Sequence, residues 1–171
     1  MCVCLCGVRT VEVSLSDRRV YREVLLPNKM QVMLVHEKNC EEAAVSLRIG
    51  IGSVSDPRSL QGLAHLTEHM LFQGSVHHKG GYSFFNFIHI HGGQANAYTS
   101  KYSTVVSFSL SPQYLAAALE RVSDILINPQ FKPKDSRKEV HAVHAEYLLR
   151  YTSDDIRTAH LIRQVHPKLR V

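Results

Sequence analysis

The string HLTEH at residues 65–69 constrains the fold of this chain more than any other feature of its sequence. Residues four apart on a helix project from one face, so a helix here sets the imidazoles of His65 and His69 side by side. The flanking residues are almost all apolar (Leu63, Ala64, Leu66, Met70, Leu71 and Phe72). Such a helix is predicted to be buried, and buried histidine and glutamate side chains need partners. A solvated helix face with two incidental histidines is the weaker interpretation.

Two neutral imidazoles with a carboxylate beside them are typical of a zinc hydrolase site. Glu68 lies one residue before the second histidine and reaches the same neighbourhood. A carboxylate in that place can take a proton from a water whose pKa the metal lowers to about 7. A catalytic zinc normally has three protein ligands, so the sequence must supply a third ligand from another part of the chain.

Two glutamates in the second half of the chain are candidates for that third ligand. Glu139 and Glu146 are seven residues apart, which places them on one face of a helix. His141 and His144 fall on roughly the opposite side of the same helix. Each glutamate also has an ordinary explanation: Glu139 completes a capping-box pattern with Ser136, and Glu146 is a solvated helix carboxylate. Spacing alone leaves these alternatives open.

The remaining patterns predict an α+β fold, with a largely antiparallel sheet packed against helices. Apolar runs of strand length and alternating residues predict the strands, and proline, capping and helical periodicity predict the helices. Strands are expected at 29–36, 43–51, 95–99 and 104–110. Helices are expected at 56–71 (ending near Gly74), at 82–90, from Ser111-Pro112 to just before Asn128-Pro129, and from Ser136 to about residue 163. The second long helix carries Glu139 and Glu146.

Length and composition indicate one globular domain. The 171 residues are 44% hydrophobic and 20% charged, with a formal charge of +5. We expect residues 1–25 to form an N-terminal segment with a frayed tip and residues 26–171 to form the catalytic domain. Lysines and arginines are scattered, and no recognition motif accompanies them, so nucleic acid is not an expected partner. No apolar run approaches the ~18–20 residues of a membrane span.

The cysteines bear on the cellular compartment. Cys2, Cys4 and Cys6 have one-residue spacers that do not match the common zinc spacing, and Cys40 stands alone. No disulfide framework is predicted, and a reducing, cytoplasmic location fits best. Acidic residues near the N-terminus argue against a mitochondrial transit peptide. Lipid attachment is a weakly supported alternative for the first three cysteines, so their role stays open.

The order H-x-x-E-H is the inverse of the common zinc-peptidase motif and is the inverzincin signature. The sequence resembles the pitrilysin and insulin-degrading-enzyme family of metallopeptidases from about residue 26 to residue 166. The matching stretches are DPRSLQGLAHLTEHMLFQGS (56–75), HGGQANAYTS (91–100) and RKEVHAVHAEY (137–147). The family's third ligand is a glutamate 77 positions after the second histidine, and here 146 − 69 = 77.

The resemblance implies a role for each residue of the site. His65, His69 and Glu146 would hold one zinc ion per chain, and Glu68 would be the general base. Glu139 would orient a histidine ligand from outside the coordination sphere. Asn96 and Ala97 match an edge strand that binds the main chain of a peptide substrate, which pairs there as an added strand.

The sequence also departs from the family. Family enzymes are much longer, and their later half supplies an arginine and a tyrosine that have no counterpart here. A second chain is one way to complete the substrate chamber. His141 replaces an asparagine that is usual in the ligand helix, a change we expect to be tolerated.

Three functions follow from these observations, in decreasing order of support. The first is a zinc-dependent endopeptidase. The second is a non-catalytic or truncated family member that binds zinc and a peptide or partner chain without turnover. The third, a histidine-rich zinc-binding protein, is weak because the histidines at 77, 78, 89 and 91 have the pattern of loop and helix-end surface.

Overall fold

The computed structural model describes residues 12–80 and 83–165, except for the side chains at positions 159, 160, 163 and 164. Cys2, Cys4 and Cys6 therefore lie outside the described residues, as does Tyr82 at the start of the predicted second helix. The chain divides into two compact units, Met1–Glu41 and Glu42–Val171. No helix in the described part of the chain is long and apolar enough to cross a membrane.

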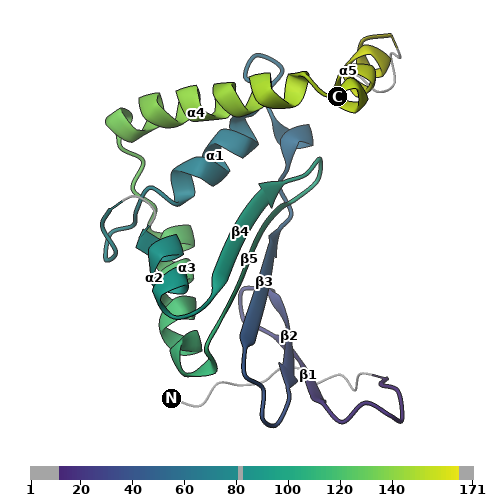
Figure 1. Ribbon diagram of the computed structural model, residues 1–171, viewed down its shortest axis with the longest axis vertical. Coiled ribbons are helices and arrows are strands. Elements are labelled where there is room, and N and C mark those ends of the chain that lie inside the picture. Colours follow the sequence, from purple (N-terminus) through teal and green to yellow (C-terminus); the bar gives the residue numbers. More distant parts are fainter. Residues whose placement is uncertain (1–11, 81–82, 166–171) are drawn as a thin grey trace. The chain divides into compact units, whose positions relative to one another are not determined.

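The first unit contains an antiparallel hairpin (Figure 1). Its strands are β1 (Val20–Leu25) and β2 (Gln31–His36). The second strand was predicted from its apolar run, and the first was not. Arg22 and Glu23 lie in the middle of β1 and interrupt the apolar pattern that identifies a strand in the sequence.

The second unit is built on a three-stranded antiparallel sheet with the order β3-β5-β4. The strands are β3 (Ala43–Ile49), β4 (Gln94–Thr99) and β5 (Thr104–Leu110). Strand β5 is central and mostly buried, whereas β4 pairs with β5 alone among the described residues and forms an edge. The predicted α+β fold with an antiparallel sheet is confirmed.

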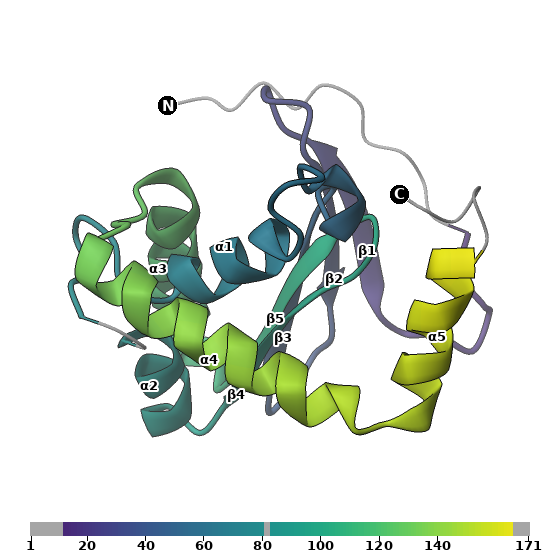
Figure 2. The ribbon, with the colours of Figure 1, turned by 90° about the horizontal axis from the view of Figure 1, so that it is seen from above.

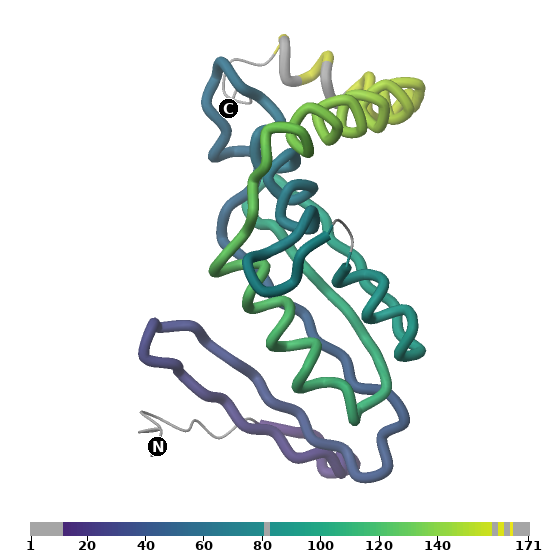
Figure 3. The backbone as a smooth tube through the Cα atoms, turned by 90° about the vertical axis from the view of Figure 1, so that its left-hand side faces the viewer, coloured from purple at the N-terminus to yellow at the C-terminus, as the bar shows by residue number. Residues whose placement is uncertain are grey.

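Helices α1 (Leu63–Leu71) and α4 (Pro133–Tyr151) pack against one another, and α1 also contacts β4. Figure 2 shows α1 and α4 side by side. Helices α2 (Ser83–Ile90) and α3 (Leu115–Ile127) lie side by side, as Figures 1 and 3 both show. The remaining elements are two short 3₁₀ helices and a last helix, η1 (Ser53–Ser55), η2 (Pro112–Tyr114) and α5 (Asp154–Val165).

The predicted start of the helix at residue 56 is wrong, because α1 begins at Leu63. Residues 57–61 form a turn instead, and Gly62 then adopts a left-handed backbone with φ of 93°. Asp56 still caps the helix from six and eight residues away. Its carboxylate accepts the N–H groups of Gly62 at 2.7 Å and Ala64 at 2.8 Å.

The long helix also differs from its prediction at both ends. It begins at Pro133, so Ser136 lies inside the first turn and the predicted capping box with Glu139 does not form. It ends at Tyr151, where the Thr152 hydroxyl donates to the Leu149 carbonyl at 2.7 Å. A polar Ser-Asp-Asp sequence then starts α5, since short polar side chains favour helix N-termini.

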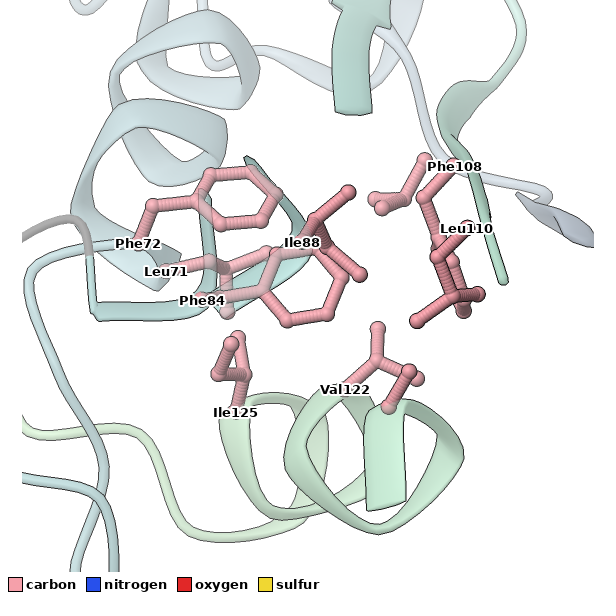
Figure 4. Packing of buried hydrophobic residues seen from close by; sticks show 10 residues of the cluster. Leu71, Phe72, Phe84, Ile88, Phe108, Leu110, Val122 and Ile125 are labelled. Atoms are coloured by element: carbon pink, nitrogen blue, oxygen red, sulfur yellow. The ribbon is translucent and has the colours of Figure 1, made fainter. Parts of the chain in front are cut away.

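The core lies where the end of α1 meets α2, α3 and β5. Figure 4 shows the side chains that fill it: Leu71, Phe72, Phe84, Ile88, Phe108, Leu110, Val122 and Ile125. Phe84 and Phe108 meet edge to face with ring centroids 5.3 Å apart. Because the last turn of α1 is part of this core, the helix that carries HLTEH is fixed at one end.

The loop after α1 is held against α3 by Asp124. This buried carboxylate accepts the backbone N–H of His77 at 3.1 Å, the His77 ring Nδ1–H at 2.8 Å and the Asn128 amide at 3.0 Å. Hydrogen bonds from the Ser75 hydroxyl and from His77 hold the pKa of Asp124 well below its ordinary value. His77 was expected to be a surface residue of a loop, and it is exposed.

Candidate metal centre

Helix α1 brings His65 and His69 together on one face. Their ring centroids are 4.8 Å apart and their planes are nearly perpendicular. About a quarter of each side chain is exposed, so both rings border solvent while the turn that follows them is buried. The predicted arrangement of the motif on a helix is therefore present.

Glu146 on α4 completes a cluster with these two histidines. Its Oε2 lies 3.5 Å from Nε2 of His65 and 3.5 Å from Nε2 of His69. One donor atom from each of the three residues lies within 4.8 Å of the others, and no other such trio occurs among the described residues. In a tetrahedral zinc site with bonds of ~2.0–2.2 Å, neighbouring ligand atoms are ~3.3–3.6 Å apart. The donor types fit zinc, and so do the two 3.5 Å separations between Glu146 and the histidines.

Glu139 holds the ring of His69. Its Oε2 lies 3.0 Å from Nδ1 of His69, and its Oε1 accepts the amide of Gln73 at 2.9 Å. A carboxylate accepts hydrogen bonds, so Nδ1 carries the proton and the lone pair of Nε2 points toward Glu146. The Glu139 side chain is 1% exposed, which makes this orientation rigid. This contact replaces the capping box that the sequence allowed as an alternative.

Glu68 is buried beside the histidines and is held by β4. The Thr99 hydroxyl donates to Oε2 of Glu68 at 2.5 Å. The neighbouring Thr104 hydroxyl, 3.3 Å from that of Thr99, donates its own hydrogen to the Ile51 carbonyl at 3.0 Å. The hydrogen bond from Thr99 links one oxygen of the Glu68 carboxylate to the sheet.

A cleft of about 410 Å³ brings together the two histidines with Glu68 and Glu146. Its lining includes both histidines, the two carboxylates and one strand of the sheet (Ser53, His65, Glu68, His69, Asn96, Ala97, Tyr98, Thr99, Glu146 and Arg150). The predicted substrate-binding residues Asn96 and Ala97 therefore lie in the wall of this cleft, on the edge strand β4. The Asn96 side-chain oxygen accepts the Ala97 N–H at 3.0 Å.

A larger hollow of about 660 Å³ lies between the start of α1 and α4. It is mainly apolar and shares His65, Glu146 and Arg150 with the cleft, but Glu68 and His69 do not line it. The groups that can hold a metal and move a proton meet in the smaller cleft, so we assign the chemistry to that cleft.

Three features of the site were not predicted. They are the contact of Gln73 with Glu139, the contact of Thr99 with Glu68, and the ion pair of Arg150 with Glu146. Nη2 of Arg150 forms an ion pair with Oε1 of Glu146 at 2.5 Å. Helical spacing places Arg150 on the face of α4 that carries Glu146, but spacing does not identify its partner. Thr99 shares a face of β4 with Ala97, since residues two apart in a strand point the same way, and this was the one available signal.

Comparison with known proteins settles the family. The sequence profile of "Insulinase (Peptidase family M16)" matches residues 31–167. The chain belongs to peptidase family M16. The resemblance noted in the sequence is therefore confirmed.

Several M16 proteins are similar to this chain. "Insulin-degrading enzyme-like 2" of Arabidopsis thaliana is 35% identical over 156 residues, which are 89% of this chain and 16% of that protein. "A-factor-processing enzyme" of Saccharomyces cerevisiae is 38% identical over 130 residues, which are 76% of this chain and 13% of that protein. The crystal structure of pitrilysin matches with a TM-score of 0.87 and 31% identity, covering 95% of this chain and 18% of pitrilysin. This chain thus spans less than a fifth of each of these relatives.

Proposed function

We propose that this chain carries the zinc-binding centre of a metalloendopeptidase that hydrolyses peptides. The observation that carries the proposal is the convergence of His65, His69 and Glu146, with Oε2 of Glu146 3.5 Å from Nε2 of each histidine. Glu68 lies in the same cleft. Membership of family M16 supports the same activity. We assign one zinc ion per chain to the three converging residues.

Glu68 is the proposed general base. Zinc bound in the cleft supplies Lewis acidity, which makes water ionise near neutral pH and polarises a peptide carbonyl. Glu68 accepts the proton of the attacking water as the water oxygen bonds to the carbonyl carbon. It then gives that proton to the amide nitrogen as the C–N bond breaks. The Thr99 hydroxyl holds one oxygen of Glu68, which keeps the carboxylate turned toward the cleft.

Strand β4 is the proposed docking site for the substrate main chain. It is an edge strand, and Asn96 and Ala97 line the cleft beside the metal position. A peptide that adds to β4 as a further strand binds through its backbone, which allows varied side chains. A substrate carbonyl that takes the Ala97 N–H replaces the Asn96 oxygen and frees the Asn96 amide for the peptide.

The test combines zinc content with cleavage of a quenched fluorescent peptide, with and without a chelator. We expect one zinc per chain and cleavage that the chelator abolishes. Glu68→Gln keeps the zinc and lowers kcat about 100-fold or more, the typical contribution of a general base. Zinc binding with no cleavage by the unaltered chain would support the alternative, a family member that binds peptide without turnover. An unchanged kcat in Glu68→Gln would remove Glu68 as the base.

A further inference from the structure

The two oxygens of the Glu146 carboxylate have different partners. Oε2 faces Nε2 of both histidines at 3.5 Å, whereas Oε1 forms an ion pair with Nη2 of Arg150 at 2.5 Å. One oxygen is therefore directed at the metal position and the other is engaged by a guanidinium group. A glutamate side chain otherwise rotates and can offer both oxygens to a cation.

Helix α4 places Arg150 where it can hold that oxygen. Residues four apart lie over one another on a helix, and glutamate followed by arginine is the favourable order. Arg150 also lies in the last turn of α4, where a positive charge interacts well with the helix dipole. The helix ends one residue later, at Tyr151, so its length is just sufficient to present this side chain.

Two other groups of the site, His69 and Glu68, have comparable partners. Glu139 holds His69 and Thr99 holds Glu68. Among the described residues that line the cleft, Arg150 is the only lysine or arginine. The ion pair of Arg150 with Glu146 positions the third predicted ligand in the same way.

We propose that Arg150 is a positioning residue that presents Oε2 of Glu146 alone to the metal. Holding Oε1 prevents the carboxylate from binding through both oxygens, which leaves one coordination position for water and substrate. This inference rests on the proposed function, because it requires zinc at the three predicted ligands.

Two effects of the arginine charge oppose each other. A guanidinium near the site repels a divalent cation, and the same group orients the carboxylate. The Arg150 side chain is 63% exposed, so water and salt screen the repulsion. Orientation is therefore expected to dominate, and removal of the arginine is expected to weaken zinc binding.

The experiment is a zinc titration of the full chain against a competing chromophoric chelator. Arg150→Met keeps the length and helix preference of the side chain but has no donor. It is expected to raise the zinc Kd about tenfold, within the range found for partners of metal ligands. Arg150→Lys is expected to recover part of the loss. Arg157→Met is the matched control, because Arg157 is an exposed helix arginine paired with Asp154 at 3.2 Å.

A double-mutant cycle identifies the route of the effect. In a Glu146→Gln background, Arg150→Met is expected to have no further effect on zinc affinity. Tighter zinc binding by Arg150→Met would overturn the proposal in favour of charge repulsion. Unchanged zinc affinity with a raised KM would overturn it in favour of a substrate contact. Failure of the unaltered chain to bind zinc would refute the proposed function itself.

Discussion

The two sides of the metal centre are held in different ways. On the α1 side, His69 is fixed by Glu139, which is 1% exposed, and Gln73 holds the other oxygen of that carboxylate. On the α4 side, Glu146 is 30% exposed and is paired with Arg150, which is 63% exposed. A buried partner serves the fold and the ligand together, because removing it leaves unpaired polar groups inside the protein. A partner at the surface affects the ligand with little effect on the fold.

The largest effect is expected from Glu139→Leu. This change leaves the Nδ1–H of His69 and the amide of Gln73 without their acceptor, at a cost of about 1–3 kcal/mol in the free energy of unfolding. It also frees the His69 ring, which is expected to raise the zinc Kd about 10–100-fold. Urea unfolding and chelator competition measure the two effects. Glu139→Gln is the matched control, since an amide oxygen can still accept from His69. A zinc Kd that stayed unchanged in Glu139→Leu would contradict the role of Glu139.

Arg150→Met tests the other side of the comparison. Exposed ion pairs contribute about 0.2–1 kcal/mol, so the free energy of unfolding is expected to fall by less than about 1 kcal/mol. The zinc Kd is nevertheless expected to rise, as argued above. Urea unfolding of the metal-free chain measures the first quantity. A loss of stability as large as that of Glu139→Leu would show that the two sides do not differ in the proposed way.

Thr99→Val probes the hold on the base. It removes the hydroxyl that donates to Oε2 of Glu68 and keeps the shape of the side chain. The loss of a hydrogen bond to a charged group is expected to lower kcat by about tenfold, with the zinc Kd unchanged. Thr99→Ser retains the hydroxyl and is expected to keep most of the activity. Steady-state kinetics on zinc-loaded protein tests this. A kcat in Thr99→Val equal to that of the unaltered chain would show that Thr99 does not position Glu68.

The smallest effect concerns Asp124, away from the centre. Its pKa is lower in the folded chain than its ordinary value of 3.8, so its hydrogen bonds stabilise the fold above that pH. This stabilisation is lost as the pH falls below about 4 and through the lower folded-state pKa. Asp124→Asn should therefore be less stable than the unaltered chain at pH 7, and the difference should shrink as the pH falls below 4. Thermal unfolding at several pH values measures it, and a difference independent of pH would refute the assignment.

Local sequence patterns predicted much of this fold. The apolar run around HLTEH indicated a helix, and the alternation in residues 104–110 indicated a strand that proves to be central. The pattern failed where a distant contact decided the outcome. Asp56 caps α1 across a turn of several residues, and hydrophobic periodicity cannot predict such a distant cap. Glu139 matched a capping box locally, but its partner is on another helix, 70 residues away.

The candidate site was predictable in composition but not in its supporting contacts. Helical spacing alone brought His65 and His69 together, whereas the choice of Glu146 came from the family resemblance. The structure brings these residues together, and their roles stay predictions. Thr99 and Arg150 could not be assigned partners from the sequence. The role of a hydroxyl or guanidinium group depends on which groups lie beside it in the folded chain. Residues near a site on the same helix face or strand face are the best candidates for such contacts.

The central claim is that His65, His69 and Glu146 hold one zinc ion. X-ray absorption at the zinc edge on the zinc-loaded chain tests it most directly. The account predicts one zinc per chain surrounded only by nitrogen and oxygen at ~2.0–2.2 Å, and a lower zinc occupancy in Glu146→Gln at the same zinc concentration. A shell of sulfur neighbours at ~2.3 Å would instead place the metal on cysteines and contradict the account.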